Sequence, residues 1–551
     1  MTQKILGPRL VLAIAMSIAS VLIAVAPAQA EDSCTSLASL SLPDTTITAA
    51  QLIPAGSYKA ADGATYSNLP EFCRVTATLM PSSDSQIRIE VWMPTTTWNG
   101  RFEGTGNGGY AGTIRYAGLA TGIQLGFASA NTDMGCVGCS SLNGDPNIGH
   151  PERWKDFGWR ATHEMTLVSK QIIYAFYNRR PEYSYFTGCS TGGQQALMEA
   201  QRFPEDYDGI LAGDAANNRT HLHQDILWIY AAAERNISDL AGFKAKVPMI
   251  TQAAVAACGK QDGGVASDPF LVDARDCNWD PAKLLCKNGN ASNCLTAGEV
   301  TAARLIYAGP QNPETGQLIY PGSARGSEDN PYYSWDGAAP LFSSTMTAPQ
   351  FNSLFKWVFG ANWDWSTFDF NHDVDKVDRV LAHELNAMSP DLTEFRMKGH
   401  KLIHYHGVAD PLISPQDGID YYLRVAAGEK GRTHEFYRLF LVPGLEHCFM
   451  GPGPNVFGAL FQAAPPSNDA QHNILIALTE WVEKGKAPEE IITTKYVKDS
   501  ADNGIAMQRP ICSYPKLPRY RGWGDTNDPK NFKCVPDEHD YNQMPAPRYL
   551  K

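Results

Sequence analysis

Beyond its first thirty residues, this 551-residue sequence has no hydrophobic run of membrane-spanning length, no internal repeat and no low-complexity segment. These absences argue against further membrane spans, repeat architectures and disordered tails. Positive charge is also scarce, since 46 lysines and arginines stand against 58 aspartates and glutamates, a formal charge of −12. So acidic a chain lacks the basic surface that attracts nucleic acid or an anionic membrane, and we expect neither as a partner.

The N-terminal segment has the composition of an export signal. Lys4 and Arg9 precede the apolar run "VLAIAMSIASVLIAVA", which ends at the small-residue stretch "AQA". This order predicts a secretory signal peptide over residues 1–30, cut before Glu31, and hence a soluble protein that is secreted or periplasmic. An uncleaved membrane anchor is the alternative, although the run is short for a span. Loss of the two cations would take the formal charge from −12 to −14.

Twelve cysteines follow this segment, an even number, and disulfide bridges are the expected state in an exported chain. Cys136 and Cys139 form a C-x-x-C pair, for which metal binding is the rival interpretation. No second pair and no His-x-x-x-His follows at zinc-site spacing, so we predict no structural zinc. A small local disulfide loop is expected at this pair instead.

The order of predicted strands and helices is that of an α/β protein. Residues 88–132 alternate apolar runs with turns, residues 152–178 have helical periodicity, and "YSYFTG" and "DGILAGDAA" are apolar strands that flank another helix. The pattern stops over residues 218–390, a region rich in Cys, Gly and Trp that is too long for a structureless loop. We therefore predict an α/β domain, residues 31–217 and 391–551, with a second domain inserted in it.

A candidate nucleophile lies at Ser190, within the pattern Gly188-Cys-Ser-Thr-Gly192. In G-x-S-x-G the chain turns so sharply from strand to helix that small residues must flank the serine. Asp410 and His447 each come just after a predicted strand, in the acid-then-histidine order of an α/β-hydrolase. Ser190 would attack an acyl carbon, His447 would take its proton, and Asp410 would orient the imidazole.

Other interpretations of these residues stay open. A glycine-rich turn, a turn-capping aspartate and a surface histidine would explain them without chemistry. His404 and His406 flank Tyr405 on a predicted strand, where they would face the core or support the loop. The stretch "GTGNGG" matches the dinucleotide-binding G-x-G-x-x-G, but "YAGTIRYAG" is a poor helix start, so we do not expect a nucleotide-binding domain.

Two cysteines lie directly beside the catalytic candidates. Cys189 precedes Ser190, and Cys448 follows His447. A bridge between them would fasten the two catalytic loops together across a long stretch of chain. The position matters because a triad loses rate quickly when its members drift apart.

These features resemble the tannase and fungal-type feruloyl esterase family, which also includes a bacterial hydrolase of mono(2-hydroxyethyl) terephthalate. The resemblance covers nearly the whole chain after residue 30 and is carried by "YSYFTGCSTGGQQALMEAQRFPEDYDGILAG", "DPAKLLCKNGNASNCLTAGEV", "LIHYHGVADPLISPQDGIDYY", "RLFLVPGLEHCFMGPGP" and "ALTEWVEKGKAPEEI". It implies an α/β-hydrolase fold with a large inserted lid domain at residues 218–390, and a triad of Ser190, Asp410 and His447. It also implies bridges to which Cys136–Cys139 would be an addition: Cys189–Cys448, Cys34–Cys73, Cys258–Cys277, Cys286–Cys294 and Cys512–Cys534.

The oxyanion hole, the substrate pocket and a metal follow from the same comparison. The serine motif makes the N–H of Thr191 one oxyanion donor, and the resemblance places the other at Gly106. The lid would supply the substrate pocket, and its tryptophans and phenylalanines would either stack on an aromatic acyl group or form the lid's own core. Lids of the family often hold calcium, but only Asp262 matches a ligand position here, with Gly259 and Ala266 where aspartates are expected.

We therefore expect a secreted serine carboxylic-ester hydrolase that cleaves esters of hydroxycinnamic or hydroxybenzoic (gallic) acids through an acyl-serine intermediate. That chemistry requires no cofactor. A terephthalate monoester is the alternative substrate, and a peptidase or amidase is the alternative within the fold. A non-catalytic binding protein on the same scaffold is the alternative of a different class. The sequence does not determine the acyl group, the alcohol or the oligomeric state.

Overall fold

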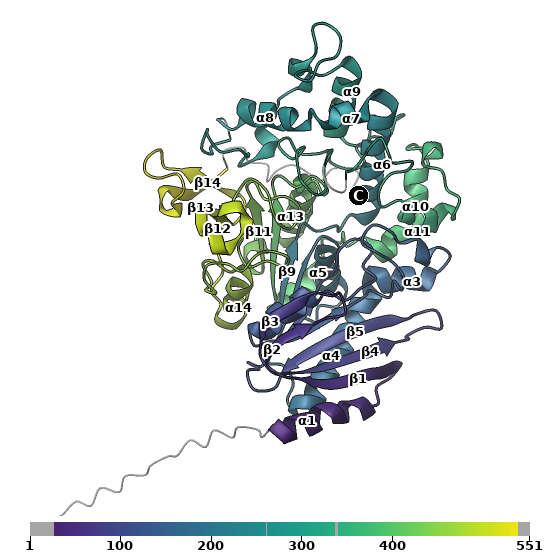
Figure 1. Cartoon of the computed structure of the whole chain (residues 1–551), viewed down its shortest axis with the longest axis vertical. Coiled ribbons are helices and arrows are strands. Elements are labelled where there is room, and N and C mark those ends of the chain that lie inside the picture. The colour runs from purple at the N-terminus through teal and green to yellow at the C-terminus, as the bar shows by residue number, and fades with distance from the viewer. Residues whose placement is uncertain (1–26, 261, 337–339, 538–551) are drawn as a thin grey trace, which may run out of the picture.

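The computed structural model describes residues 27–260, 262–336 and 340–537 (Figure 1). The signal peptide predicted over residues 1–30 lies almost entirely outside these ranges and stays a prediction. Within them, no helix is both long enough and apolar enough to cross a membrane. The first described helix, α1 (Pro27–Ser36), packs against the first strand of the central sheet.

Nine strands form one central sheet in the order β1-β4-β5-β7-β6-β8-β9-β10-β11. The β1–β4–β5 edge is antiparallel, and β5 pairs antiparallel with β7. From β7 to β11 all neighbours are parallel. This is the α/β-hydrolase architecture that the sequence predicts. The strands are β1 (Thr45–Ile53), β4 (Phe72–Leu79), β5 (Ile87–Pro94), β6 (Arg101–Thr105), β7 (Ala128–Thr132), β8 (Tyr183–Cys189), β9 (Gly209–Gly213), β10 (Lys401–Gly407) and β11 (Tyr437–Val442).

The parallel strands are buried on both faces, as their nearly continuous apolar sequences require. Successive side chains along a strand point to opposite faces of the sheet. Phe186 and Ile210 accordingly pack in the core that α4 and α5 share, whereas Tyr185 and Leu211 pack in the core that contains α14. The helices that cover the sheet are α4 (Ala161–Tyr177), α5 (Thr191–Arg202), α13 (Pro415–Glu429) and α14 (Ile474–Lys484), and the short helix α3 (Pro151–Lys155) precedes α4.

One helix in this domain differs from expectation. Strands β5, β6 and β7 occupy the region predicted to contain strands, but helix α2 (Tyr116–Gln124) lies between β6 and β7, where the sequence indicates a poor helix start. Its Leu119 and Ile123 are buried in one apolar cluster with Trp92 of β5. A tertiary contact therefore forms a helix that local propensity does not predict.

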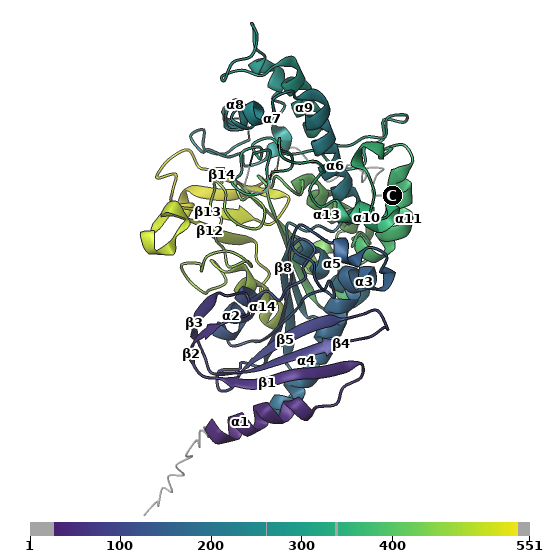
Figure 2. The ribbon, with the colours of Figure 1, turned by 45° about the vertical axis from the view of Figure 1, so that its right-hand side comes forward.

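Residues 218–390, which we call the inserted segment, contain helices and no strand among the residues that the structure describes. Its helices α7, α8 and α9 lie at the end of the molecule opposite β1, and α10 and α11 lie closer to α3 (Figures 1 and 2). Its long helix α6 packs against both α9 and α11. Its aromatic side chains stack largely on one another, for example Phe355 on Trp363 with ring centroids 4.7 Å apart. The helices are α6 (Arg219–Asn236), α7 (Leu240–Lys244), α8 (Val247–Cys258), α9 (Ala297–Ala308), α10 (Ser353–Phe359) and α11 (Asp373–Leu385).

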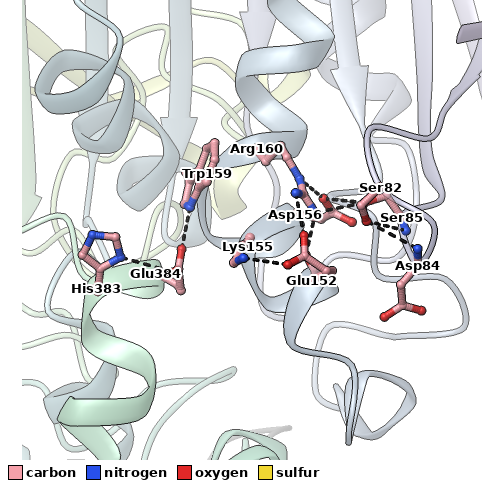
Figure 3. A network of polar contacts seen from close by, with 10 residues as sticks. All are labelled: Ser82, Asp84, Ser85, Glu152, Lys155, Asp156, Trp159, Arg160, His383 and Glu384. Atoms are coloured by element: carbon pink, nitrogen blue, oxygen red, sulfur yellow. Dashed lines mark hydrogen bonds and ion pairs between the residues drawn. The ribbon is translucent and has the colours of Figure 1, made fainter. Parts of the chain in front are cut away.

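Polar contacts join α11 to the domain of residues 31–217 and 391–551, which we call the catalytic part (Figure 3). Trp159 Nε1 donates to Glu384 Oε2 at 2.7 Å, where the C-terminal end of α11 meets a π-helical turn, Asp156–Arg160. The turn lies inside the helix predicted over residues 152–178 and separates α3 from α4. The indole therefore links the inserted segment to a helix that packs on the central sheet.

The same turn is fixed on its other side by charged groups (Figure 3). Arg160 Nε lies 2.6 Å from Asp156 Oδ1, and Arg160 Nη1 lies 2.8 Å from Glu152 Oε2. Arg160 Nη2 also donates to Ser85 Oγ at 2.9 Å. Because Asp156 is fully buried, the pairing of its Oδ1 with Arg160 stabilises a carboxylate that would otherwise destabilise the fold.

Small antiparallel sheets and six disulfide bridges complete the described fold. All twelve cysteines are paired, in the six pairs that the sequence and the resemblance imply. Cys512–Cys534 ties β13 to β15 near the C-terminal end. The remaining elements are β2 (Gly56–Lys59), β3 (Thr65–Leu69), α12 (Thr393–Met397), β12 (Glu490–Tyr496), β13 (Ile505–Cys512), β14 (Lys516–Tyr520) and β15 (Phe532–Pro536).

Candidate active site

Ser190 lies at the turn between β8 and α5 and has the unusual backbone angles φ +65° and ψ −121°. A Cβ atom on Gly188 would come within 2.3 Å of the carbonyl oxygen of Gly192, so this turn excludes larger residues. Helix α5 begins at Thr191, three residues earlier than the position near Gln194 that the sequence predicts. The local geometry is that of a strained strand-to-helix turn that presents a serine above the sheet.

His447 and Asp410 form a buried hydrogen-bonded pair. The Nδ1 atom of His447 lies 2.8 Å from Oδ2 of Asp410, and both residues come from loops at the carboxyl ends of strands. The other oxygen, Oδ1, accepts the N–H groups of Leu412 at 2.8 Å and Ile413 at 3.0 Å. Three hydrogen bonds thus fix the carboxylate and turn Nδ1 of the imidazole toward it.

The same pair sets the protonation of the imidazole. Burial by itself lowers the pKa of His447, but the charge and hydrogen bond of Asp410, with the charge of Asp214, outweigh it and raise the pKa above its ordinary value. His447 is therefore a stronger base than a free imidazole. This is the property that a general base near neutral pH needs.

Ser190 and His447 line the same cavity, which has a volume of about 410 Å³. Both the catalytic part and the inserted segment contribute to its wall. The ring of Tyr333, in the inserted segment, lies edge-on to the His447 ring with centroids 5.7 Å apart. The aromatic lining consists of Tyr332, Tyr333, Phe351, Phe449 and Phe461. None of these residues belongs to the Trp-rich patch of residues 355–370 that the sequence singles out.

The structure does not favour Gly106, which the resemblance places as the second oxyanion donor. The N–H of Gly106 donates to the carbonyl of Thr187 at 2.8 Å and is therefore already used. A Cβ on Gly106 would lie 2.5 Å from the Cα of Gly192, so this glycine is required for close packing of two backbones rather than as a donor. Gly108 lines the cavity, and no described residue accepts a hydrogen bond from its N–H. Thr191 also lines the cavity as the first residue of α5, where an N–H has no intrahelical acceptor.

A buried carboxylate that the sequence analysis missed lies behind His447. Asp214 follows β9, and its oxygens accept the N–H of Gly407 at 2.6 Å and the N–H of Cys448 at 2.7 Å. Burial, together with the charge of Asp410, raises the pKa of Asp214 to about 6. A polar residue directly after a buried strand, at the edge where catalytic loops gather, was the available signal.

The bridge Cys189–Cys448 joins the loops of the two catalytic candidates, with Cα atoms 5.9 Å apart. Cys189 Sγ also lies 3.4 Å from Oδ2 of Asp214, so the bridge and the buried carboxylate share one location. The loops of Ser190 and His447 are thereby connected by a covalent bond as well as by hydrogen bonds.

The two competing histidines are fully buried in the core. His404 Nδ1 lies 3.0 Å from the hydroxyl of Tyr437, and His406 Nε2 donates to the carbonyl of Ile413 at 3.0 Å. Neither lines the cavity. His406 supports the loop that carries Asp410, and His404 faces the core, which are the two roles that the sequence interpretation expects.

A second missed residue, Arg219, is buried beside the glycine-rich loop that contains Gly108 and Gly109. Its guanidinium donates to Thr191 Oγ1 at 2.8 Å, to the carbonyl of Gly109 at 3.0 Å and to Gln194 Oε1 at 3.2 Å. Burial lowers its pKa to about 10, so the group stays charged at neutral pH. Arg219 therefore joins the start of α5 to the glycine-rich loop that faces it.

The loop around Asp262 does not fit a calcium site. Its carboxylate oxygens accept the N–H groups of Gly264 at 2.9 Å and Val272 at 2.6 Å. Gly259 and Ala266 bring no side-chain oxygen. A hard cation needs six or more oxygen ligands, and the described residues of this loop use their one buried carboxylate on the backbone.

Comparison with known proteins places this site in context. A sequence model of the family described as tannase and feruloyl esterase matches residues 73–535. The chain is 36% identical to an uncharacterized esterase of Xanthomonas campestris pv. campestris, over 92% of each chain. It is 34% identical to feruloyl esterase B of Aspergillus niger, over 84% of this chain and 87% of the relative.

Solved structures agree with this similarity. The crystal structure of feruloyl esterase B from Aspergillus oryzae superposes with a TM-score of 0.82 at 29% identity, over 92% of this chain and all of the other. Tannin acyl hydrolase from Aspergillus niger superposes with a TM-score of 0.70 at 22% identity, over 93% and 96% of the two chains. The second likeness concerns the fold alone.

Proposed function

The chain belongs to the tannase and feruloyl esterase family and is a carboxylic ester hydrolase, and from this we propose that it cleaves esters of aromatic acids through an acyl-serine intermediate at Ser190. The observation that carries the proposal is the shared cavity of Ser190 and the hydrogen-bonded pair His447–Asp410. A serine at a strained turn, a base and a base-orienting carboxylate are the parts that acyl transfer needs.

In the proposed mechanism Ser190 Oγ attacks the ester carbonyl while His447 takes the hydroxyl proton. Asp410 keeps Nδ1 of the imidazole occupied and stabilises the imidazolium that forms. The imidazolium then protonates the leaving alcohol, and the acyl-serine ester remains. Water, deprotonated by His447, hydrolyses that ester and releases the aromatic acid with Ser190 regenerated.

Oxyanion stabilisation is assigned to the N–H groups of Thr191 and Gly108. Both residues line the cavity beside Ser190. Two preorganised donors at the developing charge supply roughly 3 to 4 kcal/mol each to the barrier reduction in serine hydrolases. Gly108 replaces Gly106 in this role, because the Gly106 N–H is bonded to Thr187.

For the substrate we propose feruloyl or related hydroxycinnamoyl esters, or galloyl and other hydroxybenzoyl esters. The cavity is small and lined by five aromatic side chains, which suits a planar aryl group. The relatives at 32–34% identity include named feruloyl esterases, which supports the hydroxycinnamoyl option.

The remaining parts of the proposal concern organisation. Residues 218–390 act as a lid over the catalytic domain, residues 31–217 and 391–551, because Tyr333 and its neighbours wall the cavity from that side. Residues 1–30 direct export, which the six disulfide bridges support. No cofactor is needed, and the loop of Asp262 gives no support for calcium.

The test is acid release from methyl ferulate, methyl gallate, methyl 4-hydroxybenzoate and a terephthalate monoester, with wild type beside Ser190→Ala. We expect at least one aromatic ester to be cleaved and the variant to be inactive. Labelling by a fluorophosphonate should modify wild type at Ser190 and leave Ser190→Ala unmodified. Folded protein that neither cleaves an ester nor takes the label would instead favour a non-catalytic binding protein.

A further inference from the structure

The catalytic cavity carries uncompensated positive charge. Among the described residues that line it, Arg115 and Arg219 are cationic and none is an aspartate or glutamate. Neither arginine forms an ion pair with any described carboxylate. A cavity wall with two such cations attracts anions and raises their local concentration.

Arg115 has most of its hydrogen-bonding capacity unused. Its backbone N–H is fixed by Asn131 Oδ1 at 2.8 Å, which anchors the residue at the start of α2. Its side chain donates one hydrogen bond to a described residue, from Nη2 to Ser141 Oγ at 3.1 Å, and the buried Nε has no partner there. A guanidinium has five donors, so this half-buried group is poised to bind a further acceptor.

Two acidic groups that share a neighbouring cavity with Arg115 are engaged elsewhere. The arginine also borders a neighbouring cavity that contains Asp62 and Glu90. Asp62 accepts from the hydroxyl of Tyr66 at 2.8 Å, and Glu90 forms a two-point ion pair with Arg74 at 2.5 and 2.9 Å. Each of these carboxylates therefore already has its partner.

Arg115 lies beside the proposed oxyanion donor and lines the same cavity as Ser190 and His447. A Cβ atom on Gly108, the proposed oxyanion donor, would lie 3.5 Å from Nη2 of Arg115. Against the raising effect of burial, the positive charge of Arg115 acts to lower the pKa of Tyr333. The ring of Tyr333 also lies edge-on to the ring of His447. The guanidinium and the imidazole of His447 thus border one cavity, and Tyr333 lies between the two groups in its wall.

We propose that the preferred substrates are aromatic esters that carry a free carboxylate, and that Arg115 is the specificity-determining residue that binds it. This inference rests on the proposed function. A planar guanidinium binds a carboxylate through two parallel hydrogen bonds, which gives orientation as well as affinity. Arg219, already bonded to Thr191 and Gly109, contributes charge to the cavity but is not a direct ligand.

The carboxylate has two chemical sources. It belongs either to the acyl part, as in a monoester of an aromatic dicarboxylic acid, or to the alcohol part, as in a hydroxycinnamate ester of a hydroxy acid. Two matched substrate pairs separate them: monomethyl against dimethyl terephthalate, and feruloylquinate against its methyl ester. Within each pair the two esters differ in charge at one group.

We expect wild type to prefer the charged member of one pair, with the difference mainly in KM. Arg115→Gln should lower kcat/KM for that ester by about 10- to 100-fold, the worth of a hydrogen bond to a charged group, and for its neutral partner by less than about threefold. Arg115→Lys should recover part of the loss, because lysine keeps the positive charge but cannot form two parallel hydrogen bonds to a carboxylate. Arg180→Gln removes the same charge from an exposed site and should change neither ester.

A second measurement uses wild type alone and does not depend on how a variant folds. The KM of the charged ester should rise with ionic strength while the KM of its neutral partner stays constant, because salt screens the attraction. Equal cleavage within both pairs, or equal losses in Arg115→Gln for charged and neutral esters, overturns the inference and leaves the esterase intact. Cleavage of no ester by folded wild type overturns the proposed function as well.

Discussion

The carboxylate of Asp214 accepts the backbone N–H of Cys448 at 2.7 Å, one residue after the catalytic histidine candidate. Its other oxygen accepts the N–H of Gly407 at the end of β10. One buried group therefore connects the ends of two neighbouring strands to the loop of His447. Because it also lies against the bridge Cys189–Cys448, it belongs to the framework that holds the site together.

Asp214→Asn should destabilise the protein and shift its pH profile. The amide can accept one of the two N–H groups and turns a donor toward the other, a loss of about 2 to 4 kcal/mol. Asp214 is also one of the charges that raise the pKa of His447, so the acidic limb of kcat/KM should move to lower pH. Chemical denaturation and a pH–rate profile measure the two effects.

The titration of Asp214 also makes the free energy of unfolding depend on pH. Since the pKa of Asp214 is raised to about 6 from 3.8, its contribution to stability is present below about pH 4 and is lost as pH rises to 6. The variant should therefore lose less stability than wild type over this interval. Asp417→Asn is the matched control: it alters another buried carboxyl, on α13, and should leave the acidic limb in place. An unchanged limb in Asp214→Asn would contradict the prediction.

Asp410→Asn should lower kcat by about 10⁴-fold, because the imidazole loses the partner that fixes its tautomer and stabilises its charged form. Catalysis needs neutral His447, so wild-type activity falls as pH drops through its raised pKa. Without Asp410 burial dominates and the pKa falls, so the residual activity should extend to lower pH. Glu446→Gln is the control, since burial raises the pKa of Glu446 to about 8 and a neutral amide resembles its protonated form. Comparable kcat values for Asp410→Asn and wild type would rule out this role.

The double variant Cys189→Ser/Cys448→Ser tests the bridge between the catalytic loops. The bridge closes a loop of 259 residues, for which the ideal chain-entropy model gives roughly 5 kcal/mol, an upper value for real bridges. We expect a lower melting temperature and a kcat reduced by more than about tenfold, because the triad members drift. Cys286→Ser/Cys294→Ser removes a bridge between two cysteines of the inserted segment that are eight positions apart in the sequence. This double variant should leave kcat unchanged. Equal effects of the two double variants would mean that the catalytic bridge has no special role.

Arg219→Met should reduce kcat by about 100-fold, since the loop of Gly109 and the start of α5 at Thr191 lose their common donor and the oxyanion N–H groups lose alignment. KM for a neutral ester should change little. Arg180→Met, at an exposed site, controls for loss of charge. The comparison needs steady-state kinetics and a melting curve for each variant, and a change confined to KM would argue against a role in oxyanion alignment.

The family resemblance supplied four of the six cysteine pairs. The sequence patterns by themselves determined the fold class, the residues of the proposed triad and the bridge Cys189–Cys448. Each of these is recorded in short patterns: a G-x-S-x-G turn between strand and helix, an acid and a histidine after later strands, and a cysteine beside each of Ser190 and His447. Such patterns can be recognised in short stretches because the local backbone geometry limits which residues fit. Only small residues, for example, fit the turn at Ser190.

The tertiary structure alone decided which groups surround these residues. Gly106 could not be separated from Gly108 along the chain, because the difference is the acceptor Thr187 on a neighbouring strand. Asp214 and the two arginines of the cavity likewise depend on segments that are distant in sequence and meet at one edge of the sheet. Helix α2 forms because its apolar face finds Trp92. Hydrogen bonds and burial between remote segments are set by how the chain packs, and packing has no short sequence pattern.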